Sequence, residues 1–125
     1  MTLAIVDDDE NVRQALARLL RCLGHDVHVF GSAEEFEAET VAVDCLILDV
    51  RLPGLSGLEL RERLRGSSTP TPVVFITGES DPKARDIFPA IDTPLVTKPF
   101  DEVTLMAAVA HAMSSAEALR ESLAD

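Results

Sequence analysis

The chain has 125 residues, which is enough for one domain with a buried core and too few for two. Acidic residues outnumber basic residues by 22 to 11, and the resulting net charge of −11 disfavours direct nucleic-acid binding, which needs a basic surface. No apolar run approaches the roughly 18–20 residues of a membrane span, and none has the form of a signal peptide. We therefore expect a cytoplasmic domain without membrane contact, in which Cys22 and Cys45 are buried and reduced.

The first half of the chain alternates strand and helix patterns. Residues 3–6 form a short apolar run that predicts a strand, and four acids follow it at residues 7–10. The next segment has helical spacing and ends at Gly24, which is typical of a helix C-terminus. The expected inner face of this helix is Val12, Leu16, Leu19 and Leu23.

A second strand and a second helix follow. Residues 26–30 largely alternate polar and apolar side chains, which predicts a strand with one partly exposed face. Ser32 and Glu35 have the spacing of a capping box, so we expect an acidic helix from there to about residue 40.

The second half continues the alternation. Residues 45–48 are continuously apolar and precede Asp49 and a proline–glycine turn, which predicts a strand buried on both faces. A helix that begins near Leu58 should turn Leu60 and Leu64 inward. Residues 73–77 are again continuously apolar and predict the fourth strand.

The last third contains the least regular patterns. Asp81 and Pro82 predict the start of a fourth helix, which Pro89 and Pro94 should make short or irregular. Residues 95–97 predict a brief fifth strand. Asp101 should cap a final helix with a long C-terminal tail. Its expected inner face is Val103, Met106, Val109, and Met113 or Ala110.

Five strands that alternate with five helices predict a single α/β domain with a doubly wound parallel sheet. The common flavodoxin-like strand order, 2-1-3-4-5, makes the first, third, fourth and fifth strands neighbours. We assign residues 1–113 to this domain, and residues 114–125 to an extension of the last helix or a C-terminal linker.

Polar residues follow each of those neighbouring strands: Asp7 and Asp8, then Asp49, Thr77 and Lys98. Each has an ordinary explanation when taken alone, such as a helix cap for an aspartate or a solvated surface position for the lysine. In a parallel sheet, however, the carboxyl ends of the strands share one edge. Three carboxylates there suit Mg²⁺, and a hydroxyl and an ammonium group suit a phosphoryl group. A carboxylate can also accept a phosphoryl group as a nucleophile.

Four segments resemble the receiver domains of two-component response regulators. They are residues 5–10 (Ile-Val-Asp-Asp-Asp-Glu), 46–53 together with Gly57, 76–78 (Ile-Thr-Gly) and 97–100 (Thr-Lys-Pro-Phe). The resemblance extends over the chain to about Met113, and four segments in order at fitting spacing are specific.

The resemblance implies a role for each site residue. Asp49 would be the phosphoacceptor, and Asp7 and Asp8 would bind Mg²⁺ with Asp49 and the backbone carbonyl of Arg51. Thr77 would be the switch hydroxyl, and Lys98 would contact the phosphoryl group. Asp9 and Glu10 are left with a structural role at the start of the first helix.

The resemblance also implies partners. A sensor histidine kinase or a phosphotransfer protein would supply the phosphoryl group, and a downstream output domain or protein would read the signal by protein–protein contact. The domain would not be an enzyme, apart from self-phosphorylation and slow self-dephosphorylation. Homodimer formation is left open.

One region departs from the family pattern. Leu95 stands three residues before the lysine, where the family usually has tyrosine or phenylalanine, and Pro89 and Pro94 interrupt the preceding helix. We therefore expect the signal to pass through backbone movement at residues 78–83. This departure weakly favours a pseudo-receiver scaffold that is never phosphorylated, whereas the intact Asp49 and the acidic pair Asp7 and Asp8 argue against one. Two other classes are less favoured: a haloacid-dehalogenase-type phosphatase would need an acid at the position of Arg51, and a flavin-binding flavodoxin would need a phosphate loop.

Overall fold

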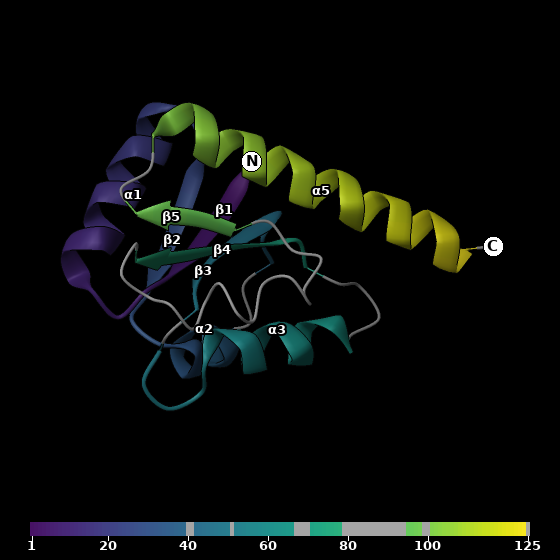
Figure 1. Cartoon of the computed structure of the whole chain (residues 1–125), viewed down its shortest axis with the longest axis horizontal. Helices are drawn as coiled ribbons and strands as arrows, with labels where there is room; N and C mark the ends of the chain where they lie inside the picture. Colours follow the sequence, from purple (N-terminus) through teal and green to yellow (C-terminus); the bar gives the residue numbers. More distant parts are fainter. Residues whose placement is uncertain (40–41, 51, 67–70, 79–94, 99–100, 125) are drawn as a thin grey trace.

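The structure is a computed structural model, and it describes residues 1–39, 42–50, 52–66, 71–78, 95–98 and 101–124. Five parallel strands form one sheet in the order β2-β1-β3-β4-β5, as the sequence predicts (Figure 1). The strands are β1 (Thr2–Val6), β2 (Asp26–Phe30), β3 (Cys45–Asp49), β4 (Val73–Gly78) and β5 (Leu95–Lys98). The fourth helix expected from Asp81, with Pro89 and Pro94, lies outside the described residues.

Four helices in the described part of the chain cover the two faces of the sheet. Helices α1 (Glu10–Cys22) and α5 (Glu102–Ala124) pack on one face, and α2 (Ala33–Glu39) and α3 (Gly57–Arg65) pack on the other (Figure 1). The core therefore has two layers, one on each side of the sheet. Helix α5 extends past the end of the sheet toward the C-terminus (Figure 1).

Strand β3 is the central strand and is buried along its whole length. Its side chains alternate between the two core layers: Cys45 and Ile47 belong to the layer under α1 and α5, and Leu46 and Leu48 belong to the other. The continuous apolar run is thus the consequence of helices on both faces. This placement carries Asp49 to the carboxyl edge of the sheet.

Local hydrogen bonds fix where the helices begin. The Asp9 carboxylate accepts hydrogen bonds from the amides of Asn11 and Val12, which caps α1 as expected. Ser32 accepts from the Glu35 amide at 3.1 Å, but the Glu35 carboxylate accepts from Gly31 rather than from Ser32. A complete capping box opens α3, where Ser56 and Glu59 each accept from the other's amide.

The C-terminus of α1 is also confirmed, since Gly24 has φ of +91° and follows the last turn. The expected inner face of α1 is partly wrong. Leu16, Ala17 and Leu20 are the buried residues, whereas Leu23 is 37% exposed. Cys22 is exposed, contrary to expectation, because it lies two residues beyond Leu20 and therefore about 200° around the helix.

The inner face of α5 also differs from the predicted one, because residues two positions apart lie on opposite sides of a helix. Leu105, Val109 and Ala112 are buried, at spacings that keep them on one face. Met106 and Met113 pack at the margin of this core. Val103 is 77% exposed, because it lies two residues before Leu105 and so points to the other side of the helix.

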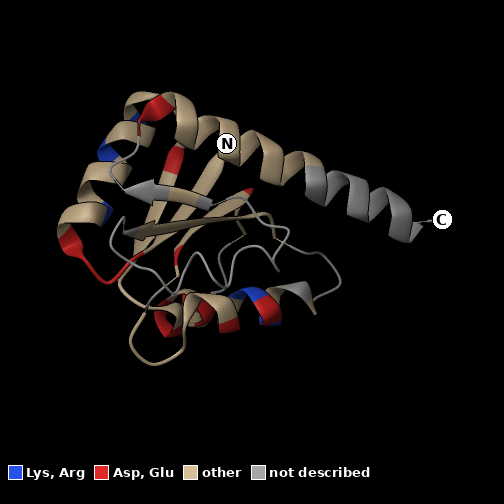
Figure 2. Ribbon diagram, in the orientation of Figure 1, with Lys and Arg blue, Asp and Glu red and all other residues tan. Residues whose placement is uncertain are grey.

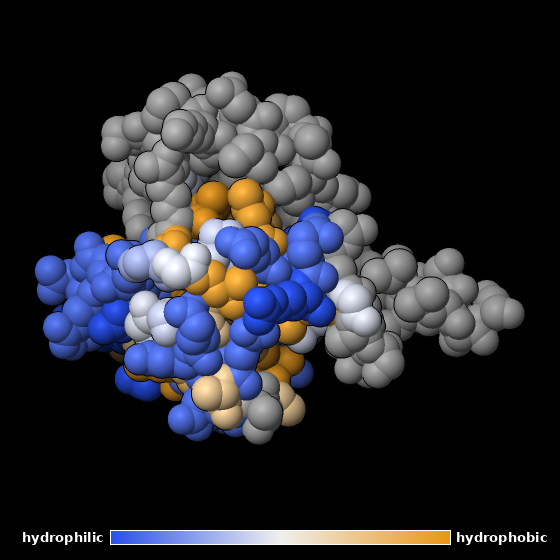
Figure 3. All heavy atoms as spheres, turned by 90° about the horizontal axis from the view of Figure 1, so that it is seen from below, coloured by the Kyte–Doolittle hydropathy of each residue, from blue (hydrophilic) through white to orange (hydrophobic). Residues whose placement is uncertain are grey.

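The described surface is mainly polar on the side of α2 and α3. Hydrophilic residues occupy most of the described area in Figure 3, which views the molecule from below. Among the helices in the described ranges, none is both long enough and apolar enough to cross a membrane.

Candidate functional site

Three of the predicted site residues come together at the carboxyl edge of the sheet. The register pairs Val6 of β1 with Leu48 of β3, so Asp7, which follows β1, and Asp49, the last residue of β3, lie at the same level. Asp7 is fully buried, Asp49 is 8% exposed, and Asp8 is exposed. One carboxylate oxygen from each of the three residues lies within 4.8 Å of the other two. The sequence prediction that these carboxylates converge is therefore confirmed.

This cluster has the donor chemistry of a site for a hard cation. Oxygen ligands on one Mg²⁺ are about 3 to 4.2 Å apart, since each Mg–O distance is about 2.1 Å. The three carboxylate oxygens lie within 4.8 Å of one another, which is close to that range. Three negative charges at this separation also repel one another, and a divalent cation offsets that repulsion.

Hydrogen bonds hold Asp7 from several directions. One of its carboxylate oxygens accepts from the Asp9 amide at 2.9 Å, and its own amide donates to the Phe30 carbonyl at 3.2 Å. Its carbonyl accepts from the Arg13 guanidinium at 2.7 Å. Arg13 is not one of the site residues predicted from the sequence. The signal in the sequence is an arginine about one turn into the helix that follows the acids.

The loop that follows Asp49 is also braced. The Val50 amide donates to the Ile76 carbonyl at 3.1 Å, and the Gly57 amide donates to the Val50 carbonyl at 3.3 Å. Glu34, from α2, accepts from the Leu55 amide at 3.1 Å. No sequence pattern indicates the Glu34 contact, since 21 residues separate the two partners. These bonds fix the backbone on the C-terminal side of Asp49.

Two further predicted residues, Thr77 and Lys98, come from the neighbouring strands β4 and β5. Thr77 is buried, with 4% exposure, and lies one residue beyond Ile76, the β4 partner of Asp49. Lys98 ends β5 opposite Gly78, so its backbone lies at the same edge, while its side chain is outside the described part. Arg51 lies outside the described residues.

Comparison with known proteins identifies the family. Residues 3–110 match the model of the response regulator receiver domain. The chain belongs to this family. Receiver domains are signalling modules of two-component systems, and the site described above lies where the resemblance of the sequence places the family's acidic pocket.

The relatives of this receiver domain are regulators and solved receiver structures. Response regulator protein TmoT of Ectopseudomonas mendocina is 39% identical over 120 residues, which cover 94% of this chain and 54% of that protein. Transcriptional regulatory protein FixJ of Azorhizobium caulinodans is 38% identical over 84% of this chain and 51% of its own length. A response regulator receiver protein from Burkholderia phymatum is 34% identical, with a TM-score of 0.76, over 90% of this chain and 94% of that one. This chain thus spans about half the length of the curated relatives it matches.

Proposed function

We propose that this receiver domain accepts a phosphoryl group on the Asp49 carboxylate. The observation that carries the proposal is the convergence of Asp7, Asp8 and Asp49, with a buried Asp49 at the carboxyl end of the central strand. The Asp49 oxygen would attack the phosphorus of a phosphohistidine and form a P–O bond. The P–N bond breaks, and its electron pair stays on the imidazole nitrogen of the donor, which takes up a proton.

The neighbouring residues would position and neutralise the phosphoryl group. Mg²⁺, held by Asp7, Asp8 and Asp49 with the Arg51 carbonyl, would supply positive charge that offsets the charge of the phosphoryl oxygens. Lys98 would offset the charge on a further oxygen, and the Thr77 hydroxyl would donate a hydrogen bond to the phosphorylated state. The strand order, which makes β3, β4 and β5 neighbours, supports these roles for Thr77 and Lys98.

We further propose that a histidine kinase or a phosphotransfer protein is the donor, and that the signal passes to an output domain or protein. The support is the family and the length of the relatives, one of which is described as a transcriptional regulator. Residues 1–113 would be the receiver domain. Residues 114–124 continue α5 and would extend it beyond the receiver core. Self-phosphorylation from small donors and slow self-dephosphorylation would accompany this role.

The test is intact-mass analysis after incubation with acetyl phosphate, with and without Mg²⁺. We expect the mass to rise by one phosphoryl group only when Mg²⁺ is present. Asp49→Asn should show no increase. Asp9→Asn is the matched control, because it makes the same chemical change beside the site, at a residue that caps α1, and asparagine also caps helices well.

The contrary outcomes are equally specific. If wild-type protein gains no phosphoryl group from acetyl phosphate or from a phosphorylated histidine kinase, the chain is a pseudo-receiver scaffold. If Asp49→Asn is phosphorylated as readily as wild type, the acceptor is another residue.

A further inference from the structure

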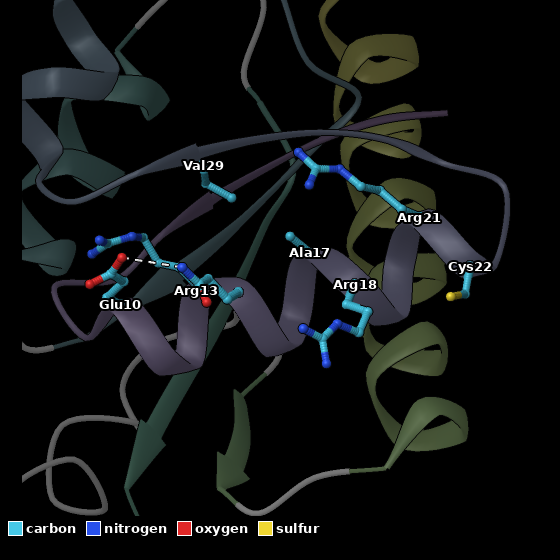
Figure 4. Close-up of a pocket in the computed structure, with 8 residues that line it drawn as sticks. Glu10, Arg13, Ala17, Arg18, Arg21, Cys22 and Val29 are labelled. Atoms are coloured by element: carbon cyan, nitrogen blue, oxygen red, sulfur yellow. Dashed lines mark hydrogen bonds between the residues drawn. The ribbon is translucent and has the colours of Figure 1, made fainter.

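A groove lies between helix α1 and the edge strand β2, with a volume of about 600 Å³ (Figure 4). Arg13, Arg18 and Arg21 line it from the helix, and Val29 lines it from the strand. Val29 is 43% exposed. Figure 2 shows these basic residues along α1, whereas acidic residues dominate α2. The groove is thus a basic surface on a strongly acidic chain.

Within the described part of the chain, no ion pair neutralises the three arginines of the groove. Ion pairs in that part include those that join Arg61 to Glu62 and Arg63 to Glu37. Arg13 and Arg21 donate instead to backbone carbonyls, those of Asp7 at 2.7 Å and Val27 at 3.0 Å. These bonds hold the two guanidinium groups in place without cancelling their charge. Glu10, the one acid among the described lining residues, accepts a hydrogen bond from Gln14.

The strand side of the groove has an open hydrogen-bonding edge. The Asp26 amide donates to the Met1 carbonyl, and the Phe30 carbonyl accepts from the Asp7 amide. The even-numbered residues of β2 therefore direct their backbone amides and carbonyls toward β1. Val27 and Val29 therefore direct their amides and carbonyls away from the sheet. The Val27 carbonyl accepts a hydrogen bond from the Arg21 guanidinium. No described residue hydrogen-bonds the backbone of Val29 on this open edge.

The spacing of the charges favours an extended ligand. Arg13 and Arg21 are eight residues apart in α1, which corresponds to about 12 Å along the axis. One carboxylate or phosphate cannot reach both guanidinium groups. Acidic side chains at alternate positions of a strand repeat at about 6.7 Å, so two repeats cover about 13 Å. A strand that pairs with the edge of β2 would run alongside α1 and present such side chains to the arginines.

From these observations we propose that the α1–β2 groove binds a short extended segment of a partner protein with acidic side chains at alternate positions. The segment adds to the edge of β2 at Val29, and its acids contact the three arginines. The net charge of −11 opposes a long polyanion such as nucleic acid, whereas a short segment needs only the local positive charge. This binding site goes beyond the proposed phosphoryl transfer and does not depend on it.

The test is an NMR titration of ¹⁵N-labelled protein with a short peptide of alternating glutamate and valine. We expect chemical-shift changes at the amides of Val29 and of α1, and slower hydrogen exchange at Val29. The same peptide with glutamine in place of glutamate should bind at least about fivefold more weakly, because it lacks the charges.

Two charge-reversal variants distinguish binding in the groove from a general effect of net charge on affinity. Arg18→Glu should weaken binding at least about fivefold, since Arg18 is exposed and makes no hydrogen bond in the described part of the chain. Arg63→Glu on α3 changes the net charge equally and should leave the affinity near that of wild type. Equal weakening by both variants, or shifts centred away from Val29, would overturn the proposal. Inorganic tripolyphosphate is the remaining probe: if it binds at these amides and the peptide does not, the ligand is a phosphate compound rather than a protein segment.

Discussion

The α-carbon of Gly57 lies directly against the backbone carbonyl of Asp49. A β-carbon at position 57 would overlap that carbonyl oxygen, and the Gly57 amide donates to the neighbouring Val50 carbonyl at 3.3 Å. The start of α3 therefore packs on the end of β3 with no room for a side chain. Close backbone approach, rather than a left-handed conformation, explains the glycine at this position.

We predict that Gly57→Ala lowers the free energy of unfolding by about 1–3 kcal/mol, because the new methyl group must displace backbone rather than a flexible side chain. The displaced backbone is that of Asp49, so the variant should also bind Mg²⁺ more weakly. Urea unfolding with and without Mg²⁺ measures both effects.

Gly66→Ala is the matched control for this variant. Gly66 follows α3 with φ of −77°, and a β-carbon at position 66 would lie 3.6 Å from its nearest neighbour, the Arg63 carbonyl oxygen. Its unfolding free energy and its response to Mg²⁺ should therefore stay close to those of wild type. Similar losses in both variants would mean that the contact with Asp49 is unimportant.

A second prediction concerns the repulsion among the three carboxylates. Asp8→Asn removes one negative charge from a cluster within 4.8 Å, so the variant should be more stable than wild type without Mg²⁺. Because Asp8 is exposed, we expect a gain of no more than about 1 kcal/mol. Added Mg²⁺ should stabilise wild type and have much less effect on the variant, as thermal unfolding over a range of Mg²⁺ concentrations would reveal.

Asp9→Asn again serves as the comparison, since Asp9 caps α1 and is not one of the three clustered acids. It should keep the wild-type response to Mg²⁺. An unchanged Mg²⁺ response in Asp8→Asn would contradict the assignment of Asp8 to the cation site.

The strands and the acidic cluster could be predicted because their signals are local. The strands other than β2 each contain a short apolar run, and the polar residue at the end of such a run must lie at the carboxyl edge of a parallel sheet. The supports of the site could not be predicted in this way. Arg13 looks like an ordinary outer-face arginine until its hydrogen bond to the Asp7 carbonyl is seen, and Glu34 reaches Leu55 across 21 residues.

Helix faces were predicted less well than strands. Helix α1 has several apolar residues beyond one stripe, so spacing alone did not decide between Leu20 and Leu23. Contact with the sheet decides, because only the residues that face β1 and β2 are buried. The same ambiguity made Val103 of α5 seem internal, although Leu105 takes that place.

A third prediction concerns acid stability at the start of α5. The Thr104 amide donates to the Asp101 carboxylate at 2.7 Å, and this hydrogen bond, followed by that of the Thr104 side chain, lowers the pKa of Asp101 below its usual 3.8. A lowered pKa in the folded state contributes stability above the unfolded pKa, and this stability is lost as the pH falls through the folded pKa. Asp101→Asn should therefore lose less stability than wild type on acidification below 3.8.

The measurement is urea unfolding at a series of pH values down to about 3. Near neutral pH the variant should be almost as stable as wild type, because asparagine is also a good N-cap. An acid-induced loss of stability identical to that of wild type would show that Asp101 does not contribute through its charge.

The last prediction separates the two cysteines by reactivity. Cys22 is exposed at the end of α1, whereas Cys45 is fully buried in β3. Burial raises the pKa of the Cys45 thiol from 9.0 to about 12, against a smaller lowering contribution from hydrogen bonding with the Leu46 backbone. The thiolate is the reactive form, so Cys45 should be inert in the folded protein. A thiol reagent such as Ellman's reagent should therefore modify one cysteine rapidly and the second only after unfolding.

The raised pKa also fixes the direction of a pH effect. Between the unfolded pKa near 9.0 and the folded pKa near 12, the folded protein retains a proton that the unfolded chain loses. The free energy of unfolding contributed by Cys45 is therefore fully present below pH 9.0 and falls as the pH rises toward 12. Cys45→Ala should show a smaller alkaline loss of stability than wild type, and Cys22→Ser should show the wild-type loss. Rapid labelling of Cys45 in the native Cys22→Ser variant would contradict the burial on which this prediction depends.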